Sequence, residues 1–304
     1  MRVTHSALFQ QQASELQRRL QEYAVYQRGG ATGRRIEKPS DDANDAVQLA
    51  LLSAENEQEQ QYLKNIRDGL TRVSSTEAAL QRLNEILTTI RADAVAAGSG
   101  TYTSDERQAA ATEIDQLLRE VASIANQQAN GRYIFGGARS DTAPFQIGRT
   151  GDGSVTQVTA DWVALDTQVF RDIAPGEALP VSIRAGVFRS DDTTTLFSVL
   201  IDLRNELRDS NSSEQVTEAL PKIDLFMSKI AETRAETGEL VNRLKSAETR
   251  SSDRGLTLTD QIATKQDWDV ADLMLKYQQA ETAYSMALQL TPRLFNLSLL
   301  QFIQ

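Results

Sequence analysis

Few residues in this sequence could do catalytic chemistry, and the most suggestive are the adjacent carboxylates Asp41 and Asp42. Two neighbouring carboxylates could act as general acid and base or could bind a divalent cation. Arg34 and Arg35 precede them, but the segment lacks the GxxxxGK[ST] order of a phosphate-binding loop. Helix capping explains the acidic pair more simply. Ser40 is a good N-cap, and the two aspartates would then lie in the first turn, where the helix dipole favours negative charge.

The composition excludes most other catalytic and metal-binding sites. The chain has no cysteine, so disulfides, zinc–thiolate sites and cysteine nucleophiles are excluded. Its single histidine, His5, rules out sites that need several histidines, and its place near a terminus is typical of a surface residue. No spacing pairs a nucleophile with a base. We therefore expect no enzyme activity, no catalytic residue, no cofactor and no metal.

Length and charge limit the organisation and the partners. A chain of 304 residues is long enough for two or three domains. Its net charge of −10 argues against nucleic acid or an anionic membrane as the main partner, since both attract basic surfaces. Residues 1–25 have neither the apolar run nor the cleavage site of a secretory signal, so no cleavable signal peptide is expected. No stretch is apolar for long enough to span a bilayer.

The two ends of the chain carry the clearest structural pattern. Apolar residues recur in steps of three and four from Val270 to Leu294, which places one apolar stripe along a helix and suits coiled-coil packing. The same steps run from Phe9 to Tyr23, and the glycines that begin at Gly29 are expected to end this first helix. Because a lone helix of this length is marginal in water, each end needs a partner. We expect the ends to pair as an antiparallel coiled coil; the alternative is two amphipathic helices on a globular core.

These stripes define a predicted assembly interface, together with the apolar run that ends the chain. Chain ends normally fray, so a cluster of large apolar side chains at a terminus is expected to be buried against another surface. The predicted interface consists of Phe9, Leu16, Leu20, Tyr23, Val270, Leu273, Tyr277, Tyr284, Leu294, Phe295, Leu299, Leu300 and Phe302.

The middle of the chain begins with two predicted helices. Apolar residues recur at helical spacing over 43–97, until the Gly98–Gly100 segment ends the pattern. Thr103 and Glu106 then match a capping box at the start of the next helix. The second helix should fold back antiparallel on the first, because the connecting loop is short.

A small β-rich insert is expected next, because the helical period stops at Asn130–Gly131. Asp152–Gly153 is a strong hairpin-turn signal. Short apolar runs occur at Val155–Val158, Trp162–Leu165, Val169–Ile173, Val181–Ile183 and Val187–Phe188.

Helical spacing returns near Thr194 and continues to a junction expected at Arg254–Gly255. The segment Ser212–Gln215 is a second candidate capping box. Pro221 lies within the helical pattern, so either the helix kinks there or it begins there with proline as its first residue.

The order helix, hinge, helices, β insert, helices, hinge, helix predicts a nested layout. The fold class is mainly α with a small β-rich insert, as a long antiparallel, coiled-coil-like helical rod built from both chain ends. The predicted domains are a terminal coiled-coil assembly domain (1–41 with 255–304), a helical rod domain (42–135 with 190–254) and a β-rich outer domain (136–189).

Three motifs resemble those of a known family. The hinge GRRIEKPSDD at 33–42 resembles a motif near the N-terminus of bacterial flagellin-like axial proteins, with Ala43 in place of the usual proline. The segments GRYIFGG at 131–137 and DTAPF at 141–145 resemble the flagellar hook-associated protein 3 family, which forms the hook–filament junction. Residues 241–244 and 297–302 are similar to the flagellin-type C-terminus. The hinge residues that carry the first match are Gly33, Arg35, Ile36, Lys38, Pro39, Ser40, Asp41 and Asp42.

The resemblance implies a structural subunit of the bacterial flagellum at the hook–filament junction. It also implies type III export without a cleaved signal, a dedicated export chaperone on the C-terminal helix, and contacts with further copies, the other junction protein, the hook and flagellin. Two alternatives stay open. The chain could be flagellin itself, since the first motif is shared, or a cytosolic helical scaffold or adaptor, which the heptads alone permit.

Overall fold

The chain folds as two compact units, which we name the terminal unit (Met1–Gln58 with Arg254–Gln304) and the central unit (Glu59–Asp253). The computed structural model describes residues 2–99, 102–151, 153–191, 193–209 and 213–302. Side chains are described for these residues except at 2–6, 8–9, 213–214 and 291–302. Within the described residues, no helix combines the length and apolarity that a membrane crossing requires.

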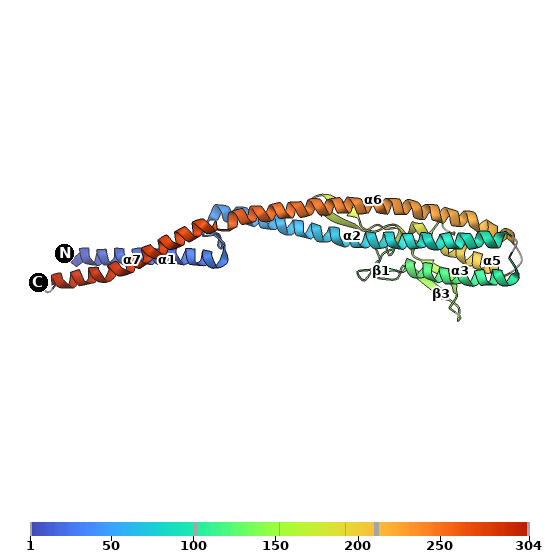
Figure 1. Cartoon of the computed structure of the whole chain (residues 1–304), viewed down its shortest axis with the longest axis horizontal. Coiled ribbons are helices and arrows are strands. Elements are labelled where there is room, and N and C mark those ends of the chain that lie inside the picture. Colours follow the sequence, from blue (N-terminus) through green and yellow to red (C-terminus); the bar gives the residue numbers. More distant parts are fainter. Residues whose placement is uncertain (1, 100–101, 152, 192, 210–212, 303–304) are drawn as a thin grey trace. The chain divides into compact units, whose positions relative to one another are not determined.

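Long helices dominate both units (Figure 1). The helices are α1 (Arg2–Thr32), α2 (Ala43–Gly98), α3 (Ser104–Ala125), α4 (Trp162–Leu165), α5 (Leu196–Arg208), α6 (Ser213–Gln266) and α7 (Val270–Phe302), with a 3-10 turn η1 (Ala185–Phe188). The strands are β1 (Gln128–Ala129), β2 (Arg132–Tyr133), β3 (Phe145–Arg149), β4 (Val155–Ala160), β5 (Phe170–Ala174) and β6 (Glu177–Pro180). Long helices with short antiparallel hairpins confirm the predicted fold class.

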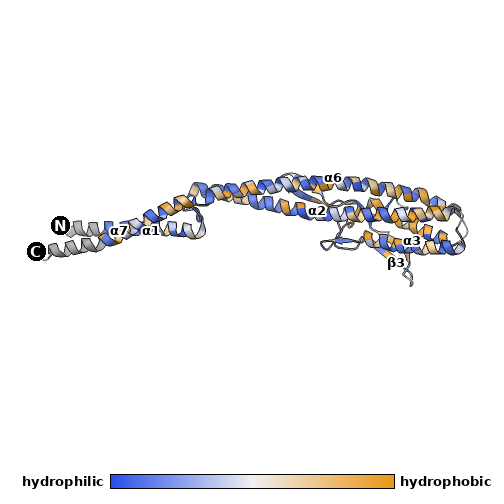
Figure 2. Cartoon of the chain, viewed as in Figure 1, coloured by the Kyte–Doolittle hydropathy of each residue, from blue (hydrophilic) through white to orange (hydrophobic). Residues whose placement is uncertain are grey.

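In the central unit, α2 and α6 run antiparallel side by side (Figure 1). Ion pairs join them at three levels, Arg67–Glu248, Arg234–Glu77 and Arg91–Asp224. The capping box predicted at Thr103 and Glu106 starts α3, which folds back along α2 as expected, with Arg82 paired to Glu120. Apolar residues gather where these helices lie together (Figure 2).

The predicted β insert consists of three separate two-stranded antiparallel hairpins, β1–β2, β3–β4 and β5–β6. Gly153, with φ of +85°, lies in the turn between β3 and β4, as the sequence indicated; Asp152 lies outside the described residues. The apolar run Trp162–Leu165 forms the short helix α4, whose first turn is capped by Asp161.

Two apolar clusters hold these hairpins on the helices. Phe145 lies at the centre of the larger cluster, with ring centroids 5.1 Å from Phe188 and 5.3 Å from Phe197. The smaller cluster fixes β5–β6, because Ile173 and Leu179 are buried there with residues of α2 and α6 such as Ile66. The packing of the β segment therefore depends on the helices beside it.

One buried ion pair crosses the larger cluster. The Arg204 guanidinium donates to Asp115 Oδ1 and to the Val155 carbonyl oxygen, both at 2.6 Å. Arg119 donates to the other carboxylate oxygen of Asp115 at 2.5 Å, and Ser154 Oγ donates to it at 3.2 Å. The Asp115 and Arg204 side chains are only 2% and 4% exposed, so α3, α5 and β4 are tied together by a desolvated charge pair.

The helix boundaries correct three expectations. Helix α1 does not stop at Gly29 but continues to Thr32, and the turn begins at Gly33, whose φ is +73°. Helix α6 does not end at Arg254–Gly255 but continues to Gln266, since an isolated glycine costs a helix only about 1 kcal/mol. Pro221 lies inside α6 and is not its first residue; Ser212 of the second candidate capping box lies outside the described residues.

The cap of α2 is a fourth correction. Asp42, not Ser40, is the N-cap, because its Oδ1 accepts from the backbone N–H groups of Asn44 and Asp45 at 3.1 Å each. Asp41 closes the preceding turn, since its Oδ2 accepts from the backbone N–H groups at positions 37 and 38. Ser40 is exposed in that turn.

We expect Asp42→Ala to lower the free energy of unfolding by about 1 kcal/mol, the usual contribution of an N-cap. Ser40→Ala is the matched control, because it removes a hydroxyl two residues away that caps nothing. Thermal unfolding followed by circular dichroism compares the two. Equal melting temperatures for both variants would contradict the assignment of Asp42 as the cap.

Candidate functional site

The candidate site lies in the terminal unit, where α1 and α7 pair side by side and antiparallel (Figure 1). Tyr23 of α1 meets two tyrosines of α7: its hydroxyl lies 3.0 Å from the Tyr277 hydroxyl, and its ring stacks on Tyr284 with centroids 5.8 Å apart. Leu273 and Ala280 are each 7% exposed. Aromatic and aliphatic contacts therefore hold the pair together.

The predicted interface residues fall into three groups. Leu273 is buried, and Leu16, Tyr23, Tyr277 and Tyr284 are half-buried. Leu20 and Val270 are 46% and 70% exposed, so the pairing of α1 with α7 leaves them open. The side chains of Phe9, Leu294, Phe295, Leu299, Leu300 and Phe302 lie outside the described residues.

Further exposed apolar residues on α7 were missed by the sequence reasoning. They are Met274, Leu275, Met286, Leu288 and Leu290, each at least 44% exposed. A search for one heptad stripe ignores them, because they lie off the stripe that faces α1. The signal that could have found them is the apolar character of α7 on several faces, which is typical of a helix that is buried all round.

A second feature is the joint, which we define as residues 33–36 together with 265–268. Here the turn between α1 and α2 pairs with the break between α6 and α7. The backbone N–H of Trp268 donates to the Gly33 carbonyl at 2.9 Å, and that of Arg35 donates to the Gln266 carbonyl at 2.6 Å. Arg34 and Asp267 form an isolated antiparallel bridge. The two breaks in the helices are therefore fastened to each other.

The Arg35 side chain reinforces the joint. Its guanidinium donates to Asp45 Oδ2 at 2.6 Å and to the Lys265 carbonyl at 2.9 Å, and it lies 3.5 Å from Asp42. It thus bridges the first turn of α2 and the last turn of α6. The hydrogen bond from Arg35 is the main reason that the pKa of Asp45 lies below its ordinary value.

Trp268 fixes α1 against the joint. A Cβ on Gly29 would lie 2.5 Å from the indole Nε1, so a larger residue cannot occupy position 29 without moving the ring. The Tyr26 ring meets the indole edge-on at 5.8 Å, and Lys276 Nζ lies 5.2 Å from its centroid. Neither Gly29 nor Trp268 was among the predicted hinge residues.

The other hinge residues have different surroundings. Ile36 is 4% exposed. Asp41 has a lowered pKa because the backbone N–H groups of Lys38 and Glu37 donate to its carboxylate. Lys38, Pro39 and Ser40 are exposed. Only part of the motif therefore builds the joint.

The site offers surfaces for packing. A cavity of about 600 Å³ lies at the joint, with Arg35, Trp268 and Lys276 among its lining residues. Within the described residues, no group of three or more acidic or histidine side chains is placed to hold a metal ion. The large exposed apolar side chains on α7, next to the hydrogen-bonded joint, suit association with other helices.

Comparisons with known proteins agree with this architecture. The family model for the bacterial flagellin N-terminal helical region matches residues 3–140. The chain is 27% identical to flagellar hook-associated protein 3 of Escherichia coli strain K12, with 99% of both chains covered. It is 26% identical to flagellar hook-associated protein 3 of Salmonella typhimurium, again with 99% of both covered. The structure of a putative flagellar hook-associated protein from Vibrio parahaemolyticus has the same fold, with a TM-score of 0.65, 22% identity, and coverage of 75% of this chain and 100% of that one.

Proposed function

We propose that the chain is a bacterial flagellin-like axial protein and a structural subunit of the hook–filament junction of a bacterial flagellum. The observation that carries this proposal is similarity to flagellar hook-associated protein 3 over 99% of both chains. The likeness therefore includes the β segment and both ends as well as the helical region shared with flagellins.

The terminal unit would supply the assembly surface. In this proposal the predicted interface residues, such as Leu20 and Val270, pack against helices of neighbouring subunits. Their exposure beside a buried Leu273 supports the idea, because each large apolar side chain taken out of water contributes on the order of 1.5–3 kcal/mol. The exposed apolar residues of α7 would be covered in the same way.

The partners follow from the place in the flagellum. The subunit contacts further copies of itself, the other hook–filament junction protein on the hook side, and flagellin on the filament side. Before assembly, an export chaperone covers the C-terminal helix. Export proceeds through the flagellar type III apparatus without a cleaved signal peptide. The large exposed side chains of α7 support the need for a chaperone; Met286, for example, is 58% exposed.

Flagellin is the second candidate function, favoured by the match of residues 3–140 to the flagellin N-terminal model. The two functions differ in amount and location: a junction protein forms a short layer, whereas flagellin forms the whole filament.

Deletion of the gene tests the proposal. Cells that lack it should keep their hooks, fail to swim, and release flagellin into the medium, because filament subunits have no layer on which to assemble. A plasmid copy should restore filaments. If the deletion strain still grew attached filaments, the junction function would be wrong; if it neither grew filaments nor exported flagellin, the flagellin alternative would be favoured.

A further inference from the structure

The sulfur chemistry of this chain rests on four methionines, because it has no cysteine. Without a thiol, the thioether of methionine is the sulfur group that peroxide can oxidise. Met274 and Met286 both lie on α7 and are 59% and 58% exposed. Met227 of α6 is half-buried against the larger apolar cluster, and Met1 lies outside the described residues. Among the described residues, the most exposed methionines therefore lie on the proposed assembly helix.

Each of these two methionines belongs to an exposed apolar strip of α7. Met274 lies one turn after Val270, which is 70% exposed, and Met286 lies one turn before Leu290, which is 56% exposed. With 3.6 residues per turn, the two methionines point about 120° apart around the helix. Neither lies on the stripe through Leu273 that packs on α1. Two separate faces of α7 therefore present a thioether to solvent.

Peroxide changes a methionine side chain from apolar to polar. Hydrogen peroxide transfers one oxygen atom to the thioether sulfur: the O–O bond breaks, an S–O bond forms, sulfur loses two electrons, and the other oxygen leaves as water with both hydrogens. The product is a sulfoxide, a polar group with a hydrogen-bond acceptor, and methionine sulfoxide reductases return it to methionine. Burying such an acceptor against a neighbouring helix without a donor is unfavourable. Oxidation therefore opposes any contact that buries these strips.

We infer that Met274 and Met286 are oxidation sites through which peroxide keeps an unassembled subunit out of the flagellum. The inference rests on the proposed function, since it takes α7 as the helix that packs on neighbouring subunits. Oxidation acts on the free subunit, in which both thioethers are exposed. Assembly covers them, so a subunit that has already assembled is protected. Reduction of the sulfoxides makes the effect reversible.

Oxidation of the purified full chain tests the reactivity of the two sites. Hydrogen peroxide is added, catalase ends the reaction, and peptide mass spectrometry measures the sulfoxide at each methionine. Met274 and Met286 should oxidise several-fold faster than Met227, because susceptibility follows exposure. In isolated flagella treated in the same way, Met274 and Met286 should oxidise roughly tenfold more slowly than in the free chain, because assembly removes that exposure. Equal rates at the three methionines, or equal rates in flagella and free chain, would overturn the inference.

Double substitutions separate the effect of polarity from the loss of methionine. Met274→Gln/Met286→Gln makes both side chains polar, as oxidation does, and should lower the amount of the protein in isolated flagella roughly tenfold. Met274→Leu/Met286→Leu keeps both side chains apolar at similar volume and has no sulfur at either site, so it should assemble like the natural chain. Calorimetry should give the same melting temperature for the purified natural chain and both variants, because the two sites are exposed before assembly. A lower melting temperature for the glutamine variant would assign its loss to folding and would contradict the inference.

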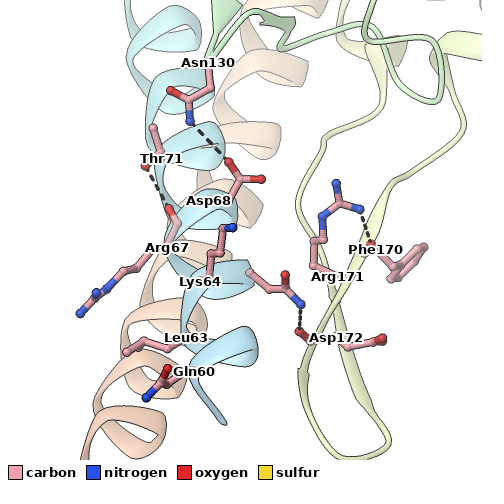
Figure 3. Close-up of a pocket in the computed structure, with 11 residues that line it drawn as sticks. Gln60, Leu63, Lys64, Arg67, Asp68, Thr71, Asn130, Phe170, Arg171 and Asp172 are labelled. Carbon is pink, nitrogen blue, oxygen red and sulfur yellow. Dashed lines mark hydrogen bonds between the residues drawn. The ribbon is translucent and has the colours of Figure 1, made fainter. Parts of the chain in front are cut away.

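Phe170→Gln is the matched control for the polar substitutions. Phe170 lies on β5 of the central unit, where it lines a groove beside α2 and is 54% exposed (Figure 3). The change makes a similarly exposed apolar side chain polar, but at a position outside α7. It should leave the amount of the protein in isolated flagella unchanged, whereas a loss equal to that of the glutamine variant would contradict a role of the α7 methionines.

Peroxide itself is tested in growing cells. A strain that lacks the gene carries it on a plasmid under an inducible promoter, and expression is induced with and without sublethal hydrogen peroxide. Peroxide should lower the number of attached filaments far more for the natural chain than for Met274→Leu/Met286→Leu, because the two chains differ only at the proposed oxidation sites. Equal losses of filaments would overturn the inference.

The outcomes separate two failures. If the natural chain enters flagella but the glutamine variant enters equally well, or the leucine variant gives no resistance to peroxide, the oxidation sites are wrong and the junction function stands. Failure of the leucine variant to assemble without peroxide also contradicts the inference, because apolar side chains at the two sites would then not suffice. Absence of the natural protein from the flagella of untreated cells overturns both proposals.

Discussion

Leu273→Asp is expected to abolish attached filaments and motility while leaving the melting of the central unit unchanged. Leu273 is 7% exposed in the α1–α7 pair, where its Cδ1 would lie 3.2 Å from a Cβ on Gly29. A carboxylate there would be buried without a partner, which costs several kcal/mol. Because residues 59–253 have a core of their own, the damage should stay in the terminal unit.

Gln278→Asp is the matched control for this prediction. It places the same side chain on the same helix, at a position that is exposed. Swimming on soft agar and electron microscopy of attached filaments measure assembly, and calorimetry of the purified full chain measures stability. Cells that swim normally with Leu273→Asp would contradict a role of this helix pair in assembly.

Arg204→Ala is expected to lower the free energy of unfolding by about 3–5 kcal/mol, because the buried Asp115 carboxylate loses its buried partner and keeps only the part-exposed Arg119. Arg119→Ala removes the other cation on the same carboxylate. Since the Arg119 side chain is 40% exposed, water can replace it, and a loss below about 1 kcal/mol is expected. Denaturant unfolding of both variants measures the difference. Equal losses of unfolding free energy in the two variants would show that the buried Arg204 stabilises the fold no more than the part-exposed Arg119 does.

The same pair makes stability depend on pH. Burial alone would raise the pKa of Asp115, but hydrogen bonds from Arg204 and Arg119 hold it below its ordinary value. A carboxylate with a lowered folded pKa stabilises the fold above its unfolded pKa, and this contribution is lost as pH falls through the folded pKa. In Arg204→Ala burial dominates and raises the folded pKa of Asp115, so protonation then favours the folded state. We therefore expect the stability difference between this variant and the natural chain to be largest near neutral pH and to shrink as pH falls, as measured by denaturant unfolding across the acid range.

The spacing and turn residues of the sequence predicted those features that depend only on neighbouring residues in the chain. The stripe that contains Leu273 and Tyr277, the capping box at Thr103 and the hairpin turn at Gly153 follow from spacing and turn chemistry alone. The structure places each of them as these rules require. The predicted division into three domains stays a prediction, alongside the two compact units of the structure.

Features that depend on tertiary contacts could not be predicted from the sequence. Gly29 looked like a helix break, yet it lies inside α1 because the Trp268 ring needs the space of a missing Cβ. Ser40 and Asp42 are both good capping residues, and only the path of the turn decides between them. The pairing of Arg35 with Asp45 and the Lys265 carbonyl joins positions 230 residues apart, which no local pattern can reveal.

Immunogold labelling of the tagged protein on isolated flagella tests the junction function most directly. The tag belongs in the turn that contains Gly153, between β3 and β4, away from both chain ends. The proposed function predicts one short band of gold at the boundary between hook and filament, on flagella that drive normal swimming. Gold along the whole filament, or none on the flagellum, would contradict it.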